Sequence, residues 1–113
     1  MAGESVPVLE REEIEAVERV PKLLEPWNVV LLDDDDHTYE YVIEMLHRLF
    51  GHDIELCFLM AKEVDTTGRV IVFTTHRERA ELEAARIHGY GADPRLPRCK
   101  GSMSAIIEPA YSI

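Results

Sequence analysis

The chain has little of several features that define common protein classes. Its 113 residues include only two cysteines, Cys57 and Cys99, and one tryptophan. The cysteines are far apart, so their spacing predicts neither a disulfide framework nor a zinc site. No apolar run approaches the roughly 18 residues of a membrane-spanning helix. The first residues, MAGESVPVLEREE, lack the basic and apolar regions of a signal peptide, so we expect a cytoplasmic protein without a membrane segment.

Positive charge is also scarce. There are 22 acidic and 12 basic residues, which gives a net charge of −10. The imbalance is largest over residues 27–65, where ten acidic residues accompany two basic ones. Such a surface repels a phosphate backbone, so nucleic acid is not an expected partner. The negative charge favours cationic ligands and basic protein surfaces as binding partners instead.

The chain divides into two parts by composition. Residues 1–26 are rich in glutamate, contain three prolines and show no sustained apolar period. This composition predicts a flexible acidic N-terminal arm. Residues 27–113 are expected to form the folded domain, because a chain of this size supports one core.

The folded part predicts the element order β-α-α-β-α-β. Strands are expected over 28–32, 69–75 and 103–107, and helices over 38–50, 54–65 and 77–90. The first helix is expected to have its N-cap at Asp36 or His37. The second helix has apolar positions at Leu56, Cys57, Leu59, Met60 and Val64. In the third helix the residues expected to lie inside are Ala80, Leu82, Ala84, Ala85 and Ile87. The fold class is therefore α+β, a small antiparallel three-stranded sheet with three helices packed on one face.

Four consecutive aspartates, Asp33–Asp36, separate the first apolar strand from the first helix. Carboxylates at the end of a strand hold an ammonium group through charge-assisted hydrogen bonds. The alternative is a solvated turn with a helix cap, but one aspartate is enough for a cap, and adjacent carboxylates repel by about 1 kcal/mol per pair in water. Calcium is disfavoured because the glycine and distal glutamate of an EF-hand are missing, so no metal or cofactor is predicted.

Two features beside this acidic run extend the prediction. Tyr39, Val42 and Ile43 form an apolar face of the first helix, which is either plain core or the wall of a pocket. Asp65 ends an apolar stripe at the C-terminus of the second helix, where the helix dipole disfavours an anion. It is either a functional carboxylate or an exposed residue that begins a turn. An apolar cavity with acids at its rim suits a free amino terminus followed by a large hydrophobic side chain.

The order and spacing of several motifs resemble the ClpS adaptor family over about residues 27 to 110. The family segment Asn-Asp-Asp-Tyr-Thr-Pro-Met-Glu-Phe-Val corresponds to DDDDHTYEYV at 33–42, and Val-Leu-x-x-Phe-Phe corresponds to MLHRLF at 45–50. The segment Met-Leu-x-Val-His-x-x-Gly corresponds to MAKEVDTTG at 60–68, and the family's closing segment to IIEPA at 106–110. The resemblance implies an adaptor that binds the N-terminal residue of substrate proteins and delivers them to a Clp-type AAA+ unfoldase, ClpA-like or ClpC-like.

The resemblance also implies roles for individual residues of a divergent paralogue. Asp33 stands at the family's asparagine, Asp65 at its pocket histidine, and Tyr39 and Ala61 at two of its methionines. The α-ammonium group would be held by Asp33, Asp34 and Asp65, and the pocket would be lined by Tyr39, Val42, Ala61, Val64 and His37. Three anions around one cation are over-charged unless one is protonated or a second cation is present.

A second set of expectations concerns the unfoldase. Glu78 matches a family glutamate near the start of the third helix, whereas Glu83 stands where the family has lysine. The loop 93–102 is longer than the family's and either folds towards the acidic run or makes a separate contact. The resemblance implies that the unfoldase engages the N-terminal arm, and a monomer is expected.

Three other classes of protein compete with this interpretation. A signalling receiver domain also ends its first strand in paired acids, but it needs a phosphoacceptor aspartate after a third strand in a five-stranded alternating fold. An enzyme needs two carboxylates in distinct environments and a cleft, so no catalytic residues are predicted. An interaction module that contacts the unfoldase, or another partner, without binding N-terminal residues predicts the same fold and differs only at the pocket.

Overall fold

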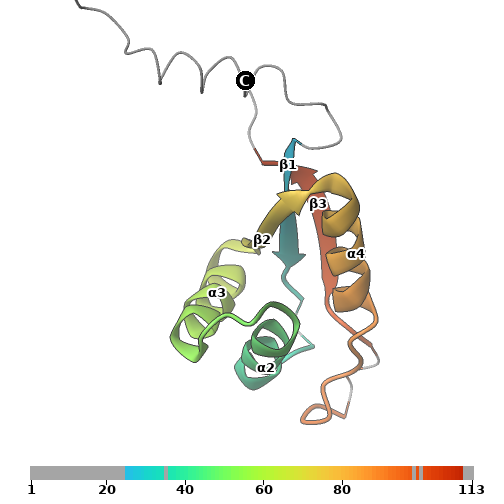
Figure 1. Ribbon diagram of the computed structural model, residues 1–113. Helices are drawn as coiled ribbons and strands as arrows, with labels where there is room; N and C mark the ends of the chain where they lie inside the picture. Colours follow the sequence, from blue (N-terminus) through green and yellow to red (C-terminus); the bar gives the residue numbers. More distant parts are fainter. Residues whose placement is uncertain (1–24, 35, 98, 100, 111–113) are drawn as a thin grey trace, which may run out of the picture.

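The computed structural model describes residues 25–34, 36–97, 99 and 101–110 (Figure 1). It confirms the predicted α+β class and the order β-α-α-β-α-β. The elements are β1 (Pro26–Leu32), α2 (Tyr39–Phe50), α3 (Ile54–Thr67), β2 (Arg69–His76), α4 (Arg77–His88) and β3 (Ser104–Pro109). The predicted arm at 1–26 lies outside the described residues except for its last two positions.

The three strands form one antiparallel sheet with β1 in the centre, in the order β2-β1-β3. Val29 pairs with Phe73 of β2 and with Ile107 of β3. The register then shifts, because the next pair joins Val30 to Ile71 and leaves one extra residue on β2, a β-bulge. The central position of β1 is consistent with its apolar run, since both edges of this strand are paired and Val29, Val30 and Leu31 are fully buried.

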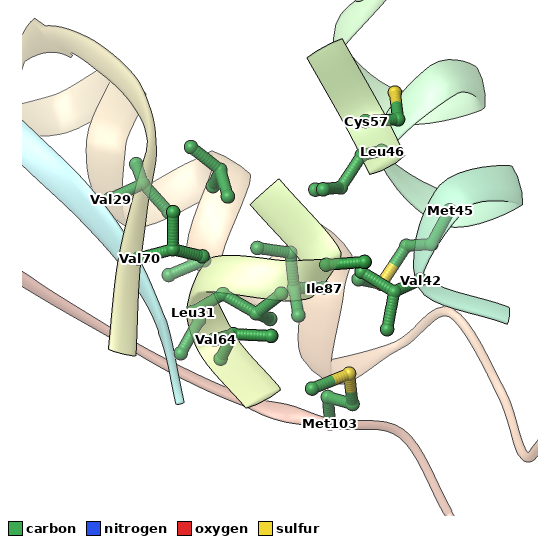
Figure 2. Close-up of a cluster of buried hydrophobic side chains, with 14 of the residues drawn as sticks. Val29, Leu31, Val42, Met45, Leu46, Cys57, Val64, Val70, Ile87 and Met103 are labelled. Carbon is green, nitrogen blue, oxygen red and sulfur yellow. The ribbon is translucent and has the colours of Figure 1, made fainter. Parts of the chain in front are cut away.

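All three helices share one core with one face of the sheet (Figure 2). The sheet contributes alternate residues of its strands, which point to the same side. Each helix contributes residues three or four positions apart, which form one stripe. The cluster includes Val29, Leu31 and Val70 from the sheet, Val42, Met45 and Leu46 from α2, Cys57, Ala61 and Val64 from α3, and Ala80, Ala84 and Ile87 from α4.

An ion pair crosses the opposite face of the sheet. Arg69 of β2 lies opposite Leu32, and Glu108 of β3 lies opposite Asn28, so the two partners flank the position of Val30. The Arg69 Nη2 donates to Glu108 Oε2 at 2.7 Å, and this bond holds the pKa of Glu108 below its usual value. Because the bridge passes over the central strand, we infer that it helps to bury Val30, which is 0 % exposed.

Helix α2 begins one or two residues later than the predicted N-cap at Asp36 or His37. Thr38 is the N-cap, in an extended conformation, and its side-chain oxygen accepts from the Tyr41 backbone N–H at 3.1 Å. Threonine is a preferred residue at this position. The helix ends as predicted at Gly51, whose φ of 73° is accessible to glycine at little cost.

Helix α3 is longer than predicted and continues to Thr67. Asp53 caps its start by accepting from the Leu56 backbone N–H at 2.8 Å, as expected from the sequence. The helix ends at Gly68, in a left-handed conformation with a φ of 90°. Asp65 therefore lies within the last helical turn, before the connection to β2.

The prediction that Leu82 and Ala85 lie inside is wrong, because both are exposed. The apolar positions Leu56 and Leu59 of α3 are exposed as well, since the buried stripes of α3 and α4 run along the neighbouring faces. In α4 the stripe includes an acidic residue, since Glu83 is fully buried between two arginines. Its carboxylate accepts from Arg79 Nε at 2.6 Å and from Arg86 Nη1 at 2.7 Å.

The described part of the loop after α4 is attached to the first turn of α2. Asp93 is 1 % exposed, and its carboxylate accepts from the Thr38 backbone N–H and hydroxyl, both at 2.8 Å, and from the Arg95 backbone N–H at 3.0 Å. Burial raises the pKa of Asp93, but these donors outweigh it and lower the pKa to about 2. Arg95 also pairs with Glu44 of α2 at 2.8 Å. Of the two predicted arrangements, the loop adopts the one directed towards the acidic run.

Replacement of a core leucine tests the shared core. Leu46→Ala is expected to lower the free energy of unfolding by about 2–5 kcal/mol, because it leaves a cavity at a position that is 0 % exposed. Leu82→Ala, on the exposed face of α4, is the matched control and should change stability by less than about 0.5 kcal/mol. Urea denaturation followed by circular dichroism measures both, and equal losses would contradict the assignment of the core.

Asp93→Asn tests the attachment of the loop. The variant is expected to lower the free energy of unfolding by about 1–3 kcal/mol at pH 7. The reason is that the hydrogen-bond donors of Thr38 and Arg95 lose a charged acceptor. The folded pKa lies below the ordinary value of 3.8, so the carboxylate stabilises the fold above pH 4 and loses this effect as the pH falls towards 2. The difference between parent and variant should therefore shrink between pH 5 and pH 2 in denaturation experiments. A difference that stays constant over this pH range would contradict the attachment.

Candidate functional site

A cavity of about 160 Å³ opens between α2, α3, the segment after β1 and the residue before β3. Residues separated by up to 70 positions in the sequence meet here, so the cavity exists only in the folded domain. Its lining consists of Asp33, Asp34, His37, Thr38, Tyr39, Val42, Ala61, Val64, Asp65 and Met103.

The structure brings all eight residues predicted for the pocket to this one cavity. It adds Thr38 and Met103, which the sequence analysis did not include. The preference of threonine for N-caps is a signal that identifies Thr38. Met103 has no local signal, because its position depends on how β3 pairs with β1.

Three carboxylates reach the rim from two directions. Asp33 and Asp34 follow the end of β1, where the Asp33 backbone N–H donates to the Gly68 carbonyl at 3.0 Å and fixes the course of the chain. Asp34 is half-buried, and its Oδ1 accepts from the Asp36 backbone N–H at 3.0 Å. Asp65 approaches from the last turn of α3. The two segments thus bring negative charge from different elements to one opening.

His37 lies beneath this rim with its side chain 3 % exposed. Its Nδ1 lies 2.6 Å from Asp34 Oδ1, and its Nε2 lies 2.8 Å from the Gly101 carbonyl oxygen. Each ring nitrogen therefore faces an oxygen acceptor. The doubly protonated ring donates to both acceptors, whereas the neutral ring donates to only one.

Tyr39 connects the two helices that enclose the cavity. Its hydroxyl donates to Asp65 Oδ2 at 2.9 Å, and this hydrogen bond is the main reason that the pKa of Tyr39 is raised. Its ring contacts Phe58 of α3, with ring centroids 5.9 Å apart. Asp65 is exposed and also lines the cavity, so both interpretations of this residue stay open.

The deeper part of the cavity is apolar. The side chains of Val42, Ala61, Val64 and Met103 line it and are each at most 4 % exposed. Engineered apolar cavities of about 150 Å³ accept a molecule the size of benzene. The observed volume thus suits a single ring or a branched aliphatic side chain, with a cationic group at the acidic rim.

In the described part of the chain, no group of three or more histidine, cysteine, aspartate and glutamate side chains is arranged to hold a metal ion. No described helix is long and apolar enough to cross a membrane.

Comparison with known proteins agrees with this geometry. The family model described as ATP-dependent Clp protease adaptor protein ClpS matches residues 22–97. The ClpS adapter protein of Vibrio atlanticus is 35 % identical over 71 residues, which are 63 % of this chain and 67 % of that protein. The ClpS adapter protein of Streptomyces coelicolor is 29 % identical over 80 residues, which are 71 % of this chain and 83 % of that protein.

A solved structure shares the fold. The structure of Agrobacterium tumefaciens ClpS2 bound to L-phenylalaninamide superimposes with a TM-score of 0.64 at 22 % identity, covering 75 % of this chain and 96 % of that one. At this identity the similarity concerns the fold alone. Because the family model spans more than half of the sequence, the chain belongs to the ClpS family of Clp protease adaptors.

Proposed function

We propose that the protein binds the N-terminal residue of substrate proteins and delivers these substrates to a Clp-type AAA+ unfoldase. The observation that carries the proposal is the cavity with carboxylates at its rim and apolar side chains at its base. The α-ammonium group would lie near Asp33, Asp34 and Asp65. The first side chain would enter the space between Val42, Ala61, Val64 and Met103. L-Phenylalaninamide, the ligand of the related ClpS2 structure, combines the same two chemical groups.

The charge of the rim suits an α-ammonium group. An ammonium group carries three N–H donors, which matches three carboxylates around one opening. Asp33 and Asp34 also lie just before the N-terminus of α2, where the helix dipole favours negative charge. The remaining negative charge is expected to attract cationic chain ends and to make binding sensitive to salt.

The proposed activity is binding without catalysis. Cys99 Sγ lies 3.4 Å from His37 Nε2, and His37 contacts Asp34, so three groups of a cysteine-protease type are close together. The same Nε2 lies closer, at 2.8 Å, to the Gly101 carbonyl oxygen, which is an acceptor. The Cys99 thiol itself donates to the same carbonyl at 3.3 Å and accepts from the Asp93 backbone N–H at 3.1 Å, so its hydrogen bonds are made within the loop. The arrangement favours a structural role for Cys99.

The surface of α4 supports contact with an unfoldase of the ClpA or ClpC type. Glu78 is exposed in the first turn of this helix. Glu83, at the family's lysine position, is buried, so its negative charge is not presented to a partner. Its two arginine partners, Arg79 and Arg86, have side chains that are 48 % and 40 % exposed and present positive charge nearby. The adaptor is expected to act as a cytoplasmic monomer with its N-terminal arm engaged by the unfoldase.

Peptide titration tests the proposed pocket. A fluorescent peptide with a free N-terminal phenylalanine should bind, and its N-acetylated form should not, because acetylation removes the cation. Asp34→Ala is expected to weaken binding by about 2–3 kcal/mol through loss of a charge-assisted bond. Asp36→Ala removes the same charge from the same acidic run but outside the cavity lining, and should have a much smaller effect. Equal affinity for free and acetylated peptides would favour the interaction module without N-terminal recognition.

A second experiment tests the surface of α4. Glu78→Lys is expected to weaken binding to a ClpA-type or ClpC-type unfoldase several-fold, because it reverses a charge at the proposed contact. Glu63→Lys makes the same change on the exposed side of α3 and serves as the control. Analytical ultracentrifugation with the ATP-loaded unfoldase measures both. A larger loss for Glu63→Lys than for Glu78→Lys would place the contact elsewhere.

A further inference from the structure

A second hollow lies next to the candidate pocket, on the outer side of the same two helices. It has a volume of about 500 Å³ and is formed by one residue of α2 and four of α3. We call it the α2–α3 groove, and its lining is Ile43, Ile54, Glu55, Phe58 and Leu59. Four of these five side chains are apolar, so the groove suits an apolar ligand.

The exposure of this part of α3 is unusual for a small domain. Seven large apolar side chains are exposed in the described part of the chain, and four of them lie in the first two turns of this helix. They are Ile54, Leu56, Phe58 and Leu59, each between 39 % and 59 % exposed. A cluster of exposed apolar side chains on one element indicates a contact surface.

The groove is continuous with the candidate pocket through Tyr39. This residue lines the pocket, and its ring contacts Phe58, which lines the groove. Ile43 follows Tyr39 by one helical turn on the same side of α2. An extended peptide advances about 3.3–3.6 Å per residue. The second to fourth residues of a chain anchored in the pocket would together advance by about 10 Å, from Tyr39 towards the groove.

We propose that the α2–α3 groove binds residues two to four of the substrate chain whose first residue occupies the pocket, and that it favours apolar side chains at these positions. The proposal rests on the function proposed above and extends it from the first residue to the following segment. The apolar lining argues for apolar side chains. The carboxylate of Glu55 at the groove and those of the pocket rim disfavour acidic residues in the same segment.

The test compares two peptides that differ only after the first residue. Both begin with a free phenylalanine, followed by Leu-Leu-Leu in one and Ser-Ser-Ser in the other. The leucine peptide is expected to bind about tenfold more tightly, which corresponds to partial burial of apolar side chains. Leu59→Ser should remove most of this ratio. Leu82→Ser, at an equally exposed leucine of α4, should leave it unchanged, since these leucines are 59 % and 55 % exposed.

The salt dependence separates the groove from the pocket. Raising the sodium chloride concentration should weaken binding of both peptides, because it screens the carboxylates, and should leave their ratio unchanged. If acetylated peptides bind as well as free ones, the N-terminal pocket is refuted. The effect of Leu59→Ser on the ratio of the affinities for the leucine and serine peptides reports on the groove alone. Ile54→Ser provides a second variant if Leu59→Ser does not fold.

Two results would overturn the proposal. One is equal affinity for the leucine and serine peptides, or a ratio that neither Leu59→Ser nor Ile54→Ser lowers. The other is a concentration-dependent dimer of the parent protein in sedimentation velocity that Leu59→Ser converts to monomer, because the groove would then be covered by a second copy of the chain.

Discussion

The buried carboxylate of Asp93 is the contact on which the arrangement of the pocket depends. It comes from the loop after α4, yet its hydrogen bonds end at Thr38, the N-cap of α2. Thr38 lies between the acidic run and Tyr39, so its position determines where both approach the cavity. A buried charge is tolerated only when its hydrogen bonds are satisfied, and the donors from Thr38 and Arg95 meet this requirement. The lowered pKa of Asp93 shows that these donors outweigh the cost of burial.

The negative charge at the pocket is compatible with a stable fold because the three carboxylates have different surroundings. Asp33 and Asp65 are exposed, so water screens their mutual repulsion. Asp34 is more buried, but it has His37 and the Asp36 backbone N–H as neighbours. Asp65 lies at the unfavourable end of a helix dipole and is stabilised by the hydroxyl of Tyr39. Each carboxylate thus has its own local compensation, while the opening as a whole stays negative.

Many features that depend on local sequence were predicted correctly, although the N-cap of α2 is Thr38 instead of Asp36 or His37. The element order, the end of α2 at Gly51 and the cap of α3 at Asp53 follow from short-range signals that few contacts elsewhere can override. The residues of the pocket were also identified, because an acidic run next to an apolar strand and helix is a local pattern, and the family resemblance indicated Ala61 and Val64.

Features that depend on packing were not accessible from the sequence. The exposure of Leu59 and Leu82 reflects which face of each helix meets the sheet, and hydrophobicity alone does not distinguish a core leucine from a leucine of a contact surface. The burial of Glu83 depends on two arginines that approach it from adjacent turns. Met103 and Asp93 reach the site through a loop whose path is determined by contacts with α2, far away in the sequence.

Tyr39 has a consequence for how specificity can evolve in this adaptor. Its hydroxyl holds a carboxylate of the pocket, and its ring forms part of the border with the neighbouring apolar surface. A mutation at this single position would alter the shape of both regions at once. Selection for a different substrate residue in the pocket is therefore coupled to the shape of the α2–α3 groove. Compensating changes are expected at positions 58 and 65 in homologues where residue 39 differs.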